Sequence, residues 1–200
     1  MKREMLRISA LRANVSREEA IAQMRGSGLT RIAANAISGP VRMIADAYVP
    51  FRLFSADIFN AEAHERQWLA IDAVEGALDA YGFDGPIRGE ALTEIDSRNV
   101  LPGMLSGERA AEMLKDKVRR MIFGRGFFRM RDLRIEIADA GMEFYVPYWL
   151  AFRGHGARAS VMVMDAVRRR MEGAKARAVF REWLVRGEEK RLMPEMAGGR

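Results

Sequence analysis

The sequence predicts an α+β fold made of two related units, each a helix packed on a small antiparallel sheet, and three observations lead to this prediction. Tyr48-Val49-Pro50-Phe51 returns as Tyr145-Val146-Pro147-Tyr148, and Ala70-Ile71-Asp72-Ala73-Val74 is matched by Val163-Met164-Asp165-Ala166-Val167. Upstream of both pairs stand the serine-led segments Ser16-Arg17-Glu18-Glu19-Ala20 and Ser106-Gly107-Glu108-Arg109-Ala110. Because the landmarks recur in the same order, an internal duplication explains them better than chance does.

Each unit is expected to begin with a helix. Ser16 and Glu19 have the spacing of a capping box, which predicts a helix to about Arg25 that stops at Gly26 or Gly28. After Ser106, apolar residues recur at three- and four-residue spacing, which predicts an amphipathic helix of about four turns. The apolar positions of that helix are Ala110, Met113, Leu114, Val118, Met121 and Ile122.

The Tyr-Val-Pro runs follow these helices and alternate as strands do. Val49 and Val146 lie on the faces expected to be buried, and the residues on either side of them point away. Proline cannot donate a hydrogen bond to a ladder, so each strand is expected at a sheet edge or to begin near its proline. Polar turns then lead to second strands. The expected turns and strands are Asn60 to Arg66 with Trp68 to Ile71, and Gly154 to Gly156 with Ser160 to Met164.

Asp72 and Asp165 end the second strands, where an aspartate commonly accepts hydrogen bonds from the backbone that follows. We therefore expect them to form turns rather than to act in catalysis. A closing helix is expected from near Gly173. This organisation divides the chain into a first unit (1–83), a connector (84–103), a second unit (104–187) and a flexible tail (188–200).

Composition narrows the classes of function. The chain has 200 residues and no cysteine, which excludes disulfides and thiolate metal sites. The common nucleotide-binding and hydrolase motifs are absent, and we expect no catalytic residue, no metal and no cofactor. His64 and His155 fall in corresponding turns; they are expected to be solvated, since two histidines without assigned carboxylates do not make a metal site. Without an apolar leader or a membrane span, a cytoplasmic location is expected.

The two units should fold in a way that resembles the PepSY-type repeat, in which a helix packs on a small antiparallel sheet. The resemblance is carried by the helix and strand segments above, and by the Asp-Ala that leads to a glycine at the turn out of the second strand. In this chain those turns are Asp72-Ala73-Val74-Glu75-Gly76 and Asp165-Ala166-Val167 with Gly173. The resemblance implies a non-catalytic binder, as tandem helix-on-sheet folds such as the β-lactamase inhibitor proteins tend to be.

Two functions of different classes are predicted. The first is a non-enzymatic module that binds a protein or a small ligand through an outward aromatic sheet face or the seam between the units. The face of a strand that points away from the core rarely needs a tryptophan. A tryptophan expected on this face therefore indicates a contact surface. Its candidate contact residues are Tyr48, Arg52, Tyr145 and Trp149.

The alternative is a nucleic-acid-associated protein. Residues 1–100 hold 12 Lys/Arg against 14 Asp/Glu, whereas residues 101–200 hold 21 against 13. The basic stretch from Lys115 to Arg134 also contains Phe127 and Phe128, and basic residues with aromatics can hold phosphates and stack bases. The same pattern is typical of a helix with a solvated basic face. The candidate anion-binding residues are Lys117, Arg120, Arg125, Arg168, Arg169 and Arg170.

Overall fold

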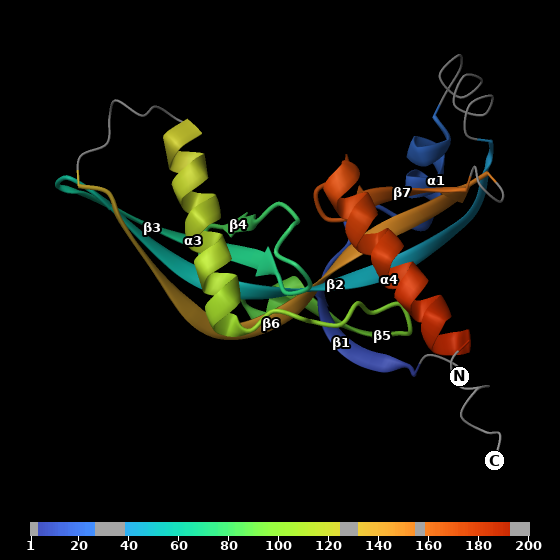
Figure 1. The fold of residues 1–200 in the computed structure, drawn as a ribbon, viewed down its shortest axis with the longest axis horizontal. Coiled ribbons are helices and arrows are strands. Elements are labelled where there is room, and N and C mark those ends of the chain that lie inside the picture. Colours follow the sequence, from blue (N-terminus) through green and yellow to red (C-terminus); the bar gives the residue numbers. More distant parts are fainter. Residues whose placement is uncertain (1–3, 27–38, 125–131, 155–158, 193–200) are drawn as a thin grey trace.

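The chain is an α+β protein, and this level of the fold prediction is confirmed. The computed structural model describes residues 4–26, 39–124, 132–154 and 159–192, with side chains as far as residue 187. Over these ranges, three α-helices pack on a curled mixed sheet (Figure 1).

Two long antiparallel strands form the centre of the sheet. β2 (Val41–Asn60) and β6 (Arg134–Arg153) run side by side along the long axis of the molecule (Figure 1). The two Tyr-Val-Pro segments pair with each other, so that Val49 faces Val146. β3 (Ala63–Asp72) continues the sheet beside the second part of β2, and β7 (Ser160–Asp165) lies beside the second part of β6.

The expectation that the prolines mark edge strands is wrong, because Pro50 and Pro147 lie inside the two central strands. The Pro50 carbonyl accepts from the Ala73 N–H at 2.8 Å, and the Pro147 carbonyl accepts from the Ala166 N–H at 3.1 Å. In a strand, the N–H and C=O of one residue point to the same side. The N–H that each proline lacks would therefore point toward β3 or β7, at the place where that strand ends. The β2–β6 ladder needs no donor from either proline and is not interrupted.

Two of the longer strands were not predicted. β1 (Leu6–Leu11) pairs antiparallel with β5 (Leu92–Ser97), and Ala10 of β1 bridges to Tyr145 of β6 in parallel. The segment 84–103 is therefore not only a connector. The remaining short elements are β4 (Tyr81–Phe83), the 3-10 turn η1 (Gly89–Ala91) and β8 (Arg170–Met171).

The first two helices begin as predicted. α1 (Arg17–Arg25) has the capping box: the Glu19 N–H donates to Ser16 Oγ at 3.2 Å, and the Ser16 N–H donates to the Glu19 carboxylate at 2.8 Å. It ends at Gly26, whose φ is 70°. α3 (Gly107–Gly124) is longer than the four turns expected, and Met121 on it is 38% exposed rather than part of the core.

The last helix, α4 (Ala174–Leu192), continues beyond its predicted end. A glycine in a helix costs only about 1 kcal/mol relative to alanine. The good helix formers Glu188, Glu189 and Lys190 follow Gly187, so the helix passes through the glycine. The predicted tail is therefore helical to Leu192, and 193–200 lie outside the described residues.

Helices cover both faces of the central ribbon. α3 packs against Phe54 and α1 packs against Ala151, and these two strand residues point to the same face. α4 packs through Phe180 against Tyr148 on the opposite face, with ring centroids 5.3 Å apart. The expectation of an open outer face is therefore wrong over much of the ribbon, because successive strand residues alternate and both sets are covered.

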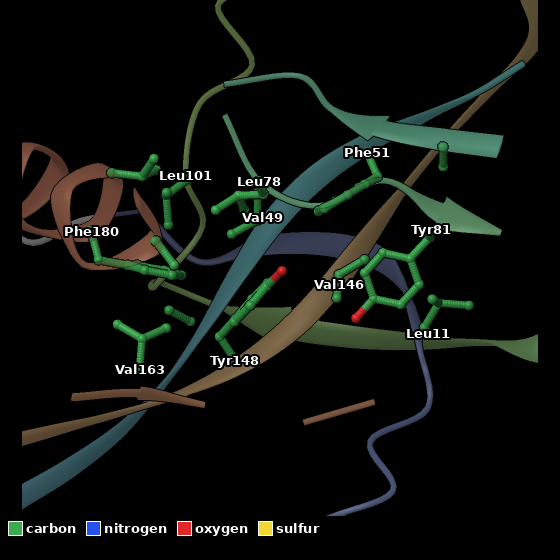
Figure 2. Close-up of a cluster of buried hydrophobic side chains, with 14 of the residues drawn as sticks. Leu11, Val49, Phe51, Leu78, Tyr81, Leu101, Val146, Tyr148, Val163 and Phe180 are labelled. Atoms are coloured by element: carbon green, nitrogen blue, oxygen red, sulfur yellow. The ribbon is translucent and has the colours of Figure 1, made fainter. Parts of the chain in front are cut away.

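Aromatic rings fill the larger core, on the side of α4. Phe51 meets Tyr81 edge to face with centroids 5.3 Å apart, and it stacks on Phe144 at 6.3 Å. Figure 2 shows Tyr81 and Tyr148 among the aliphatic side chains of this cluster. Their hydroxyl groups are the polar atoms that such a core must accommodate.

Candidate functional site

A cavity of about 530 Å³ lies where β2 begins and β6 ends, beside α4. We call it the arginine pocket. It is formed by residues from both predicted units, since Arg42 and Met43 come from the first and the other residues from the second. The lining residues are Arg42, Met43, Phe152, Arg153, Gly154, Ala159, Ser160, Val161, Arg181 and Leu184.

The sheet supplies an apolar floor for the arginine pocket. Met43 pairs with Phe152 across β2 and β6, and Phe152 pairs with Val161 across β6 and β7. Residues directly opposite in a ladder point to the same face, so the three side chains lie in a row. Arg181 and Leu184, three residues apart on α4, form the wall on the same side of their helix.

Two glycines bring the ends of the central strands together at the rim of the pocket. Gly39 has a φ of 75° and precedes β2, and Gly154 has a φ of 68° and follows β6. A Cβ on Gly39 would lie 3.2 Å from the Cα of Gly154. Only glycine combines this left-handed backbone with so close an approach.

Arg153 is the buried polar group of the site. Only 5% of the residue is exposed, and its Nη2 donates to the Met24 carbonyl at the end of α1, at 2.6 Å. Its Nε has no hydrogen-bond partner among the described residues. Residues alternate along β6, and the hydrogen bond to Met24 holds the guanidinium on the α1 face of the sheet, opposite Phe152 and α4.

The electrostatics of the arginine pocket are one-sided. Arg42 and Arg181 are exposed at its rim, and none of its described lining residues is acidic. The guanidinium groups of Arg42 and Arg181 therefore flank a mostly apolar floor, whereas that of Arg153 is buried against the end of α1. A guanidinium offers planar, paired donors that match the oxygens of a carboxylate or a phosphate.

The sequence did not single out Arg42, Arg153 or Arg181. A weak signal was present for Arg153, a charged residue that directly follows the apolar run ending at Phe152. Nothing local to the three arginines indicates that they share one pocket.

The four predicted contact residues do not form one open aromatic surface. Tyr48 is 7% exposed and packs with Ile8 and Ala10 of β1, so the expectation that it is exposed is wrong. Tyr145 is half-buried against the same cluster. The physical reason is that β1, which was not predicted, covers this part of the ribbon.

Arg52 and Trp149 lie on the same face of the ribbon but on opposite sides of its centre. Arg52 pairs with Glu143 at 3.2 Å, whereas the indole N–H of Trp149 donates to the Val15 carbonyl at 3.0 Å. Both side chains are half-buried. Trp149 thus has a structural partner next to α1, and the structure does not bring it together with Arg52.

Several predicted anion-binding residues are engaged within the protein. The Lys117 ammonium donates to the Leu78 carbonyl, and burial lowers its pKa. Arg168 lies over the ring of Tyr81, with its Cζ 3.6 Å from the ring centroid. Arg120 is exposed on α3, and Arg125 lies outside the described residues.

The other two arginines of the predicted hairpin tip also have partners. Arg169 pairs with Glu19 at 3.3 Å, and Arg170 pairs with Asp79 at 2.8 Å and with Glu172 at 3.0 Å. Surface ion pairs of this kind contribute only about 0–1 kcal/mol each, but they occupy the guanidinium groups. The tip is therefore tied to neighbouring elements.

The two buried aspartates form turns, as predicted. Asp72 accepts from the N–H groups of Glu75, Gly76 and Leu78 at 2.8–3.0 Å. Asp165 accepts from the N–H groups of Val167 and Arg168 at 2.9 and 2.8 Å, and also from the Tyr81 hydroxyl. Both residues are 0% exposed. Their carboxylate oxygens are therefore held by donors of the fold itself.

His64 is engaged with neighbouring side chains of its own hairpin. His64 lies in β3, where its Nε2 is 2.6 Å from an Asp57 oxygen and its ring stacks on Phe59. His155 lies outside the described residues. Among the residues that the structure covers, no three histidine or acidic side chains gather as metal ligands.

All four tyrosines should resist ionisation in the folded protein. Burial is the first cause that raises the pKa of each, and it brings the pKa of Tyr48 to about 12 from an ordinary value of 10.0. A raised pKa contributes stability that is fully present below pH 10.0 and is lost as the pH rises through the folded-state pKa. A spectroscopic titration should therefore show less tyrosinate absorbance at pH 10.0 in the native protein than in the denatured protein. Denatured protein, as the control, should be half ionised there; a native protein that titrates with it would contradict the burial of these rings.

Comparison with protein-family models, with curated proteins and with solved structures finds no match to this chain. The resemblance to PepSY-type repeats therefore stays a prediction. Within the described ranges, no helix is both long enough and apolar enough to cross a bilayer.

Proposed function

We propose that the protein is a non-enzymatic binding module whose ligand occupies the arginine pocket, in the seam between two related units. The observation that carries the proposal is a cavity of about 530 Å³ with an apolar floor and the exposed side chains of Arg42 and Arg181 among its lining residues. Cavities of roughly 300–1,000 Å³ are typical of small-molecule sites.

A binding role is favoured over a catalytic one by the state of the acidic groups. The buried carboxylates of Asp72 and Asp165 accept hydrogen bonds from the turns that they form. No acidic or histidine side chain is among the described lining residues of the pocket. The groups that most often transfer protons in enzymes are therefore not at the cavity.

We further infer that the two units are copies related by an approximate twofold axis through the pair of Val49 and Val146. The supporting observations are hydrogen bonds that correspond across the centre. Ala73 donates to Pro50, as Ala166 donates to Pro147. The Ala73 carbonyl in turn accepts from the Met104 N–H at 2.7 Å, as the Ala166 carbonyl accepts from the Asn14 N–H at 2.8 Å.

This relationship also suggests why the pocket lies at one end of the central ribbon and not at the other. By the same correspondence, Phe152 and Val161 of the pocket floor match Ser55 and Trp68. Trp68 pairs with Phe83 of β4, and both rings pack against the larger core. In the second unit Val161 stands where the first has Trp68, and α4 lies beside it, which leaves room for a ligand.

A fragment screen by ligand-observed NMR with the full chain tests the proposal. We expect a Leu184→Trp variant to lose the hits that the native protein binds, because the indole would fill the pocket. Val185→Trp is the matched control, since Val185 is 49% exposed and does not line the cavity. Hits that bind Leu184→Trp unchanged, or a screen without any hit, would contradict the proposal.

The alternative of nucleic-acid binding through the second half receives less support, because most of its described arginines have partners within the protein. A gel shift with single- and double-stranded nucleic acid at about 50 mM salt tests it. A complex that dissociates steeply as salt is added would favour this class. In that case Arg120→Gln should weaken it, since Arg120 is exposed on α3.

A further inference from the structure

We draw no further inference here: the strongest candidate, the outer edge of β2 over residues 41–46 beside the arginine pocket, pairs with no other strand of the described ranges, and nothing in the structure shows what covers it.

Discussion

Replacing Asp165 with alanine is expected to lower the free energy of unfolding by roughly 3–5 kcal/mol. The residue is 0% exposed, and its carboxylate accepts from the N–H groups of Val167 and Arg168 and from the Tyr81 hydroxyl. Alanine would remove the acceptor for all three donors. A hydrogen bond to a charged group contributes about 1.5–3 kcal/mol, and a buried donor left without a partner carries its own penalty.

Urea unfolding of a small set of variants measures this effect. Tyr81→Phe removes one donor and leaves a carboxylate oxygen of Asp165 without it, so a loss of about 1–3 kcal/mol is expected. Asp79→Ala is the matched control, because the side chain of Asp79 is 64% exposed and its pair with Arg170 lies at the surface. That control should cost no more than about 1 kcal/mol. If Asp165→Ala costs as little as Asp79→Ala, the turn does not depend on the aspartate.

The elements that could be predicted from the sequence are those specified by nearby residues. The capping box of Ser16 and Glu19 sets the start of α1, because both partners lie within one turn. The turns at Asp72 and Asp165 are likewise made by side chains that reach the backbone within six residues. Local chemistry of this kind requires no knowledge of the rest of the fold.

The positions of the prolines could not be predicted, because they depend on partners far away in the chain. Proline excludes a hydrogen bond on only one side of a strand, and which side faces a neighbour is decided by the tertiary structure. Pro50 is tolerated in a central strand because β3 ends beside it. The rule that proline favours an edge is sound on average and fails here for this geometric reason.

The strands β1 and β5 were missed for different reasons. Leu6, Ile8 and Ala10 alternate with polar residues, so β1 carried a period-two pattern that could have been found. In β5 only Leu92 and Ile95 are large and apolar, and they do not alternate. That strand is formed through its ladder with β1, which a local pattern does not reveal.

The candidate site was beyond the reach of local patterns altogether. Arg42, Arg153 and Arg181 come from β2, β6 and α4, which lie together only in the folded protein. The arginines that the sequence singled out are consecutive or lie on one helix, and most of the described ones found partners inside the protein. Clusters of charge along the sequence therefore did not indicate the arginines of the candidate pocket, since a pocket gathers residues in space.

Replacing Phe51 with alanine is expected to lower the free energy of unfolding by about 3–5 kcal/mol. Phe51 is 0% exposed in the middle of β2, and its ring contacts Tyr81 edge to face at 5.3 Å and stacks on Phe144 at 6.3 Å. Alanine would leave a cavity between the central strands and the segment that carries Tyr81. Aromatic pairs contribute about 0.5–1.5 kcal/mol beyond the burial of their area, so the loss should lie toward the upper end.

Two further variants separate the effect of volume from that of the ring. Phe51→Leu keeps most of the side-chain volume and leaves a smaller cavity. It should therefore lower the free energy of unfolding by less than Phe51→Ala does. Phe59→Ala is the matched control on the same strand, because Phe59 is only half-buried and contacts His64 and Arg134 near the outer end of β2. Equilibrium unfolding in urea should rank the three variants with Phe51→Ala the least stable. Equal losses for Phe51→Ala and Phe59→Ala would contradict the central position assigned to Phe51, because a ring at the outer end of the ribbon has far less packing to lose.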